Sequence, residues 1–96
     1  MEQQAILTSL KEYLSIARDR YHVLSLGIFG SVARNTFQDN SDLDIVVELE
    51  KPKMFDLIAI KQDVEERVGK RVDIVLWDEF LNPFLQKRIR QEAIYV

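Results

Sequence analysis

Hydrophobic residues recur along this chain with two different spacings, and these spacings divide it into helices and strands. From Glu2 to about Arg18 they recur every three or four positions, which predicts an amphipathic helix with one face on a core. Three stretches, 23–29, 43–49 and 71–76, are instead almost continuously apolar. These runs predict three strands, and the run 23–29 has so few polar residues that we expect it to lie inside the sheet.

The second half of the chain carries two further helical signals. Residues 53–68 again have a helical period, and Gly69 stands where a helix commonly ends. Asn82 followed by Pro83 is typical of a helix start, which places a last helix after them. The tail 93–96 is apolar and strand-like, so it either adds to a sheet edge or covers a partner surface.

The order of these elements indicates the fold class. With a short helix at 31–37, helices and strands alternate from the first predicted helix to the last. This alternation predicts an α/β fold with a small mixed β-sheet flanked by helices. A length of 96 residues leaves room for one core, so we expect residues 1–96 to form a single domain.

Composition narrows the class of protein. Hydrophobic residues make up 47% and charged residues 30% of the chain, which is typical of a globular protein. No apolar run is long enough to cross a bilayer, and the first residues lack the features of a secretory signal. Because there is no cysteine, disulfides and thiolate metal sites are excluded. We therefore expect a cytoplasmic protein that does not contact a membrane.

The charge balance limits the possible ligands. Thirteen basic and 16 acidic residues give a net charge of −3, which argues against broad nucleic-acid binding. A single nucleotide remains possible because a metal ion and an arginine can neutralise it locally, and a basic protein partner is also compatible. His22 is the only histidine, and with no acid/base or metal partner nearby in the sequence we assign it a structural role.

The chemistry-bearing residues gather between the first two predicted strands. Gly30 lets the backbone approach a ligand, and Ser31 opens a short helix whose N-terminus attracts anions. Asp42 and Asp44 introduce the second strand, where alternation points both carboxylates to the same side and a divalent cation would relieve their repulsion. A phosphate on the turn and a metal ion on the aspartates fit this layout; the alternative is a surface strand that begins with two acids.

Two further charged residues have both a functional and a structural interpretation. Asp73 interrupts the apolar run of the third strand, where an unpaired buried carboxylate would be costly. It is either a functional carboxylate or the partner of Arg71 or Arg34 in an ion pair. Arg34 follows Gly30 by about one helical turn, so it either reaches a triphosphate and braces the acidic loop, or pairs with Asp39 or Asp42.

Three weaker signals complete the set of candidates. Ser41 either orients the aspartate pair or simply ends the loop. The basic segment 87–90 is either a solvated helix face or a contact for nucleotide phosphates or an acidic partner. The apolar residues Phe80, Leu81 and Phe84 raise the possibility of a homo-oligomer or a complex.

The layout of these residues resembles a known family. A Gly-Ser pair, ten further residues and Asp-x-Asp, here Gly30-Ser31 and Asp42-x-Asp44, resemble the signature of the polymerase-β-like nucleotidyltransferase superfamily. The fuller runs at 30–34 and 41–44 are most similar to the minimal nucleotidyltransferase (MNT) family of small prokaryotic proteins. The resemblance covers nearly the whole chain.

The resemblance implies a fold and a reaction. It implies a polymerase-β-like nucleotidyltransferase fold and Mg²⁺-dependent transfer of AMP from ATP to a hydroxyl. Two Mg²⁺ ions would be held by the catalytic carboxylates Asp42, Asp44 and Asp73. The nucleotide would be bound by Gly30, Ser31, Arg34 and Ser41.

The resemblance also implies a partner. MNT proteins are commonly the antitoxin of a type VII-like toxin–antitoxin pair whose toxin is a HEPN-domain ribonuclease, and some attach AMP to a tyrosine of that toxin. One alternative is a non-catalytic antitoxin that binds and sterically blocks the toxin. Another is a nucleotidyltransferase for small molecules, although such enzymes usually carry an added helical substrate domain.

Overall fold

The computed structural model describes all 96 residues, and its helices and strands follow the predicted alternation. None of the helices combines the length and the apolar character needed to cross a membrane. The elements in chain order are α1 (Gln3–Tyr21), β1 (Val23–Phe29), α2 (Gly30–Arg34), β2 (Leu43–Leu49), α3 (Met54–Val68), β3 (Val72–Leu76), α4 (Pro83–Glu92) and β4 (Ile94–Tyr95).

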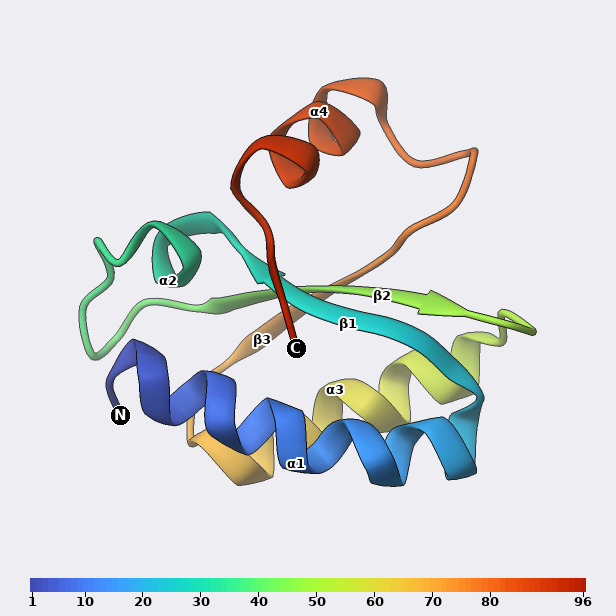
Figure 1. Cartoon of the computed structure of the whole chain (residues 1–96), viewed down its shortest axis with the longest axis horizontal. Coiled ribbons are helices and arrows are strands. Elements are labelled where there is room, and N and C mark those ends of the chain that lie inside the picture. The colour runs from blue at the N-terminus through green and yellow to red at the C-terminus, as the bar shows by residue number, and fades with distance from the viewer.

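The four strands form one mixed sheet in the order β3-β2-β1-β4 (Figure 1). β1 is antiparallel to both β2 and β4, whereas β2 and β3 are parallel. This sheet confirms the predicted α/β class, and β4 settles the alternatives for the tail because it adds to the sheet edge. Gly27 makes that pairing possible, since a Cβ atom there would lie 2.8 Å from the ring atom Cδ1 of Tyr95.

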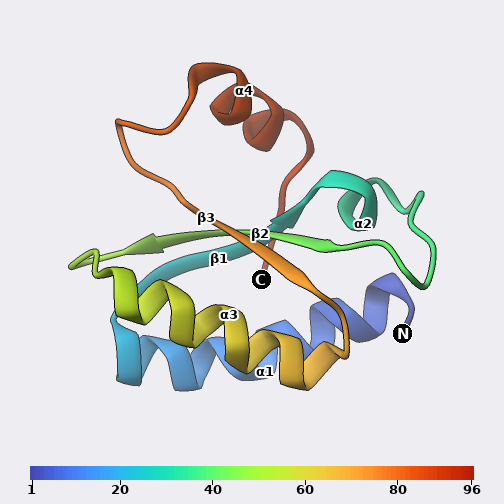
Figure 2. The same ribbon diagram turned by 180° about the vertical axis from the view of Figure 1, so that it is seen from behind.

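The two faces of the sheet are covered differently. Helices α1 and α3 lie side by side on one face, while α4 crosses the other face with α2 at one end (Figures 1 and 2). The α1–α3 face holds a core cluster of 17 buried residues. The α4 face holds a separate cluster of three, namely Phe29, Val46 and Ile89.

Helix α2 is shorter than the predicted helix 31–37 because Asn35 ends it. Asn35 adopts the left-handed conformation with φ of 60°, and its N–H donates to the carbonyls of Ser31 and Val32. Asparagine tolerates this conformation better than most residues, so one turn of helix is closed there. The chain then runs as a loop to the start of β2.

The other helix ends agree with the sequence signals. Gly69 ends α3 with φ of 66°, and Asn82 caps α4 by accepting from the N–H groups of Phe84 and Leu85. His22 ends α1 with φ of 56°, in the left-handed region that closes helices. The backbone of this histidine therefore closes α1.

Candidate active site

Asp44 and Asp73 lie side by side near the beginnings of two parallel strands. The register between β2 and β3 pairs Asp44 with Asp73 and Leu43 with Val72. Directly paired residues point to the same face of a sheet, and successive residues point to opposite faces. Because Leu43 and Val72 belong to the core on the α1–α3 face, both carboxylates point to the α4 face.

The charge of Asp42 acts on the same pair. Burial raises the pKa of Asp44 above its ordinary value of 3.8, and the negative charges of Asp73 and Asp42 raise it further. Arg88 and Arg34 act on that pKa in the opposite direction. Asp42 and Asp73 therefore both lie within electrostatic reach of Asp44, and a bound cation would relieve the repulsion.

These carboxylates do not form a closed metal cage. No group of three acidic, histidine or cysteine side chains is close enough to hold a metal ion by itself. Mg²⁺ does not need such a cage, because it commonly takes one or two protein carboxylates and completes its shell with water and substrate phosphates. The adjacent pair Asp44 and Asp73, with Asp42 beside it, fits a Mg²⁺ ion that binds together with a nucleotide.

Asp73 is exposed, so its interpretation as a costly buried carboxylate was wrong. β3 is an edge strand of the sheet, which leaves Asp73 open to solvent. The ion-pair alternative is also wrong, since Asp73 pairs with neither Arg71 nor Arg34, and Arg34 binds Glu92 instead. What supports Asp73 as a site residue is its pairing with Asp44 and its access to a ligand.

Gly30, at the turn from β1 into α2, lies against the carboxylate of Asp44. It has φ of +76°, a conformation that residues with a side chain rarely adopt. A Cβ atom at this position would also collide with Oδ2 of Asp44. The absence of a side chain at Gly30 therefore lets the turn approach the Asp44 carboxylate.

The two serines take different positions. Ser31 directly follows Gly30 in α2, and its carbonyl accepts from the N–H of Thr36 at 2.9 Å. Ser41 Oγ accepts from the N–H of Gln38 at 2.9 Å, so its side chain closes the turn at 38–41. This contact fits the loop-ending role considered for Ser41. Lys70 supports this loop by donating to three of its backbone carbonyls.

Glu92 lies beside the candidate site, although no sequence pattern indicated that position. Its Oε2 accepts from Arg34 at 2.9 Å, while its Oε1 accepts from Arg88 at 3.2 Å and from the Gly30 N–H at 3.0 Å. The alternative that Arg34 pairs with Asp39 or Asp42 was wrong, because Arg34 pairs with Glu92. The spacing of Arg88 and Glu92 by four residues on a helix was a visible signal, but their link to Gly30 depends on tertiary structure.

The contacts of Glu92 also set its ionisation. Partial burial acts to raise the pKa of Glu92, but hydrogen bonds from Arg34, Gly30 and Arg88 outweigh burial and hold it below the ordinary value of 4.5. Glu92 is therefore a carboxylate at neutral pH. Together with Arg34 and Arg88 it forms a cluster with two basic side chains, and the charges of these arginines act on Asp44.

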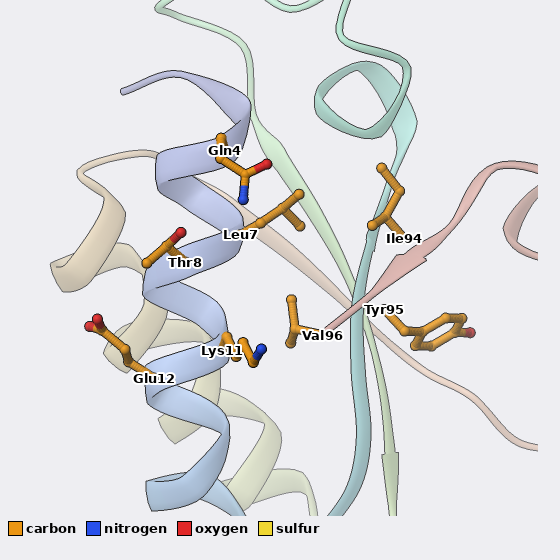
Figure 3. Close-up of a pocket in the computed structure, with 8 residues that line it drawn as sticks. All are labelled: Gln4, Leu7, Thr8, Lys11, Glu12, Ile94, Tyr95 and Val96. Atoms are coloured by element: carbon orange, nitrogen blue, oxygen red, sulfur yellow. The ribbon is translucent and has the colours of Figure 1, made fainter.

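The larger of two surface hollows lies away from these residues. It is a groove of about 680 Å³ between α1 and β4, which Figure 3 shows in close-up. The groove is lined by Gln4, Leu7, Thr8, Lys11, Glu12, Ile94, Tyr95 and Val96. It contains none of the aspartates and only one basic side chain. The open surface around Gly30 and Asp44 is the better candidate for the chemistry because it gathers opposite charges and a glycine turn.

Several proteins are similar in sequence to this chain over most of its length. Residues 10–96 match the nucleotidyltransferase domain family. The chain is 35% identical over 88 residues to a candidate protein adenylyltransferase of Methanocaldococcus jannaschii, with 91% of this chain and 90% of that protein covered. It is 34% identical over 96 residues to the protein adenylyltransferase MntA of Thermococcus cleftensis, with 99% and 93% covered.

Solved structures agree with these matches. A candidate minimal nucleotidyltransferase is 32% identical, with a TM-score of 0.82 and with 98% of this chain and 95% of that chain covered. A chain from the solved complex of a tri-AMPylated Shewanella oneidensis HEPN toxin with an MNT antitoxin is 17% identical, with a TM-score of 0.69 and with 97% of this chain and 70% of that chain covered. At this identity the likeness is one of fold alone. Because the family match and two relatives above 30% identity extend over nearly the whole sequence, this chain belongs to the nucleotidyltransferase family and, within it, to the minimal nucleotidyltransferases.

Proposed function

We propose that this chain transfers AMP from ATP to a hydroxyl of a partner protein, with residues 1–96 acting as one catalytic domain. The observation that carries the proposal is the pairing of Asp44 with Asp73 across β2 and β3, directly beside the Gly30 turn. This arrangement gathers carboxylates for a metal ion next to a turn for phosphates. The relatives named protein adenylyltransferases support the choice of AMP and of a protein acceptor.

The reaction needs few protein groups. The acceptor oxygen bonds to the α-phosphorus of ATP while the bond from that phosphorus to the pyrophosphate oxygen breaks, and the hydroxyl proton leaves to a carboxylate or water. Asp42, Asp44 and Asp73 would hold one or two Mg²⁺ ions, which neutralise phosphate charge and favour an in-line displacement when bound. We assign the acceptor proton to Asp73 because it is the exposed member of the three.

The phosphates of ATP would lie on the turn and its arginines. The Gly30 N–H already donates to Glu92, so Gly30 contributes chiefly by its conformation and by its close approach to Asp44. Ser31, at the start of α2, and the guanidinium group of Arg34 are the groups that would contact phosphate. The contact of Ser41 with Gln38 leaves it a supporting role in the loop.

We further propose that the acceptor is a tyrosine of a HEPN-domain toxin and that the chain is its antitoxin in the cytoplasm. The fold match to an MNT antitoxin in complex with an AMPylated HEPN toxin supports this partner class. A domain of this size offers little surface to enclose a small acceptor. A protein that brings its own surface to the exposed Asp73 suits it better.

Intact-mass analysis of the protein of the neighbouring gene, co-expressed with this chain, tests the proposal. With ATP, Mg²⁺ and the wild-type chain we expect the partner mass to increase by one or more AMP groups. The double variant Asp42→Ala/Asp44→Ala should give no increase. Asp19→Ala, an exposed acid in α1 on the opposite layer, is the matched control and should act as wild type.

Two other outcomes would overturn the proposal. If the wild-type chain adds no mass but still forms a stable complex that silences the partner, it acts as a steric antitoxin. If it transfers AMP to a small hydroxyl compound without any partner protein, it is a small-molecule nucleotidyltransferase. Neutralisation that survives Asp44→Ala at full strength would separate binding from catalysis within the same complex.

A further inference from the structure

The carboxylate of Glu92 lies at the centre of a cluster that joins distant parts of the chain. It accepts from the backbone of Gly30 in the β1–α2 turn, from Arg34 at the end of α2 and from Arg88 one turn earlier in α4. Figure 1 shows the end of α4 beside α2 at the same end of the sheet. Both oxygens of the carboxylate are engaged by these donors.

Exposure within the cluster is uneven. The side chain of Glu92 is 18% exposed, whereas those of Arg34 and Arg88 are 46% and 53% exposed. The carboxylate is thus the inner member, and the two guanidinium groups extend outward from it. Each guanidinium has five N–H donors in a planar fork, and Glu92 accepts one from each, so both keep donors for an anion outside the cluster.

The two arginines also lie within electrostatic reach of the aspartates. Arg88 lies over the Phe29 ring with its central carbon 5.9 Å from the ring centre, and Phe29 is paired with Asp44 across β1 and β2. Without a competing anion, either arginine would be drawn to Asp44 by opposite charge. Such a pair would block the carboxylate that is to bind metal and would remove a cation from the phosphate side.

We propose that Glu92 is a positioning residue, which holds Arg34 and Arg88 away from Asp44 and aims their outer donors at a bound triphosphate. The inference rests on the proposed function for the identity of that anion. Glu92 touches neither substrate nor metal ion in this role. It acts through the two arginines, and through the Gly30 amide it ties them to the turn beside Asp44.

Binding of tripolyphosphate and of ATP, each with Mg²⁺, tests this role by calorimetry. Glu92→Gln keeps an oxygen for the Gly30 N–H but loses the charge that orders the arginines. We expect it to weaken binding of both ligands about tenfold, the lower end of the effect of losing a supporting contact. Gln91→Ala, an exposed neighbour on α4, is the matched control and should bind as wild type.

A double-mutant cycle separates positioning from a general effect on folding. In an Arg34→Gln/Arg88→Gln background, Glu92→Gln should cause no further loss of tripolyphosphate affinity because its effect passes through those arginines. An equal loss in both backgrounds would overturn the proposal, as would a melting temperature that falls while affinity stays unchanged. Tighter binding in Glu92→Gln would also overturn it, since Glu92 would then be a competitor for the phosphate position.

The same measurements distinguish a failure of this inference from a failure of the proposed function. If wild type transfers AMP and Glu92→Gln matches it in affinity and rate, the positioning role fails and the function stands. If wild type binds tripolyphosphate in a Glu92-dependent way but transfers no AMP, the function fails and the positioning role stands.

Discussion

The two faces of the sheet differ in the residues that they carry. The face under α1 and α3 buries a continuous cluster of 17 apolar residues, whereas the face under α4 buries only three and carries the charged side chains of the site. Alternation along β2 and β3 produces this division, because each residue that points to the larger core is followed by one that points to the α4 face. One face therefore stabilises the domain and leaves the other free to hold repelling carboxylates.

The largest expected effect is a loss of AMP transfer in a variant that remains folded. Asp44→Asn should lower AMP transfer on the order of 10³-fold, the scale of losing one electrostatic contact to a transition state. Its free energy of unfolding without Mg²⁺ should not fall, because the change relieves repulsion with Asp73. Rate assays and urea unfolding of the same preparation check both parts. A loss of stability that accounts for the lost rate would contradict the division between the faces.

Substitutions in the two hydrophobic clusters should instead lower the stability of the fold. Leu10→Ala, in the larger core cluster, should lower the free energy of unfolding by about 2–5 kcal/mol. Ile89→Ala, in the smaller cluster, should cost about 2 kcal/mol, the lower end of that range, because its surroundings can relax toward solvent. At temperatures where both variants remain folded, only Ile89→Ala should also lower activity, since α4 carries Arg88 and Glu92. Equal effects on activity would show that the faces are not independent.

Gly30 and Gly69 have similar backbone conformations, but only Gly30 lies close to the Asp44 carboxylate. Comparing substitutions at the two positions therefore measures the effect of that contact. Gly69→Ala has open space around the new Cβ atom, so it should cost about 1–2 kcal/mol for its left-handed conformation alone. Gly30→Ala has that same cost and in addition a collision with the Asp44 carboxylate, so it should destabilise more and abolish activity. Equilibrium unfolding of the two variants measures the difference. Equal losses would mean that Asp44 moves aside freely.

The smallest expected effect is on the pH dependence of stability, to which Glu92 and Asp44 should contribute with opposite signs. Glu92 has a lowered pKa, so its stabilisation is complete above pH 4.5 and is lost as the pH falls through the folded-state value. Asp44 has a raised pKa, so its cost appears as the pH rises above 3.8 and is complete above its folded-state value. The free energy of unfolding of Glu92→Gln should be below that of wild type at neutral pH and approach it at low pH. That of Asp44→Asn should rise relative to wild type as the pH rises.

Urea unfolding in chelator across this pH range checks both slopes. Asp19→Asn, at an exposed acid far from the site, serves as the control and should follow wild type at every pH. Slopes of the same sign for Glu92→Gln and Asp44→Asn would contradict the assignment of opposite environments to the two carboxylates.

Local patterns were sufficient for much of this molecule. The helical period, the apolar runs and the cap residues Gly69 and Asn82 predicted the element order because each depends on residues only a few positions apart. The motif around Gly30 and Asp44 was visible for the same reason. Even so, the predicted helix 31–37 was too long, since a left-handed asparagine ends α2 at a point where periodicity alone does not.

The relations between distant residues were decided by tertiary structure. The register of β2 with β3 pairs Asp44 with Asp73, and the path of α4 across the sheet brings Glu92 to the Gly30 amide. The exposure of Asp73 likewise follows from an edge position that no local pattern reveals. Sequence alone determined which residue types and which elements are present, because those follow from local preference. Which charges meet depends on strand register and helix packing, and these are fixed only when the whole core forms.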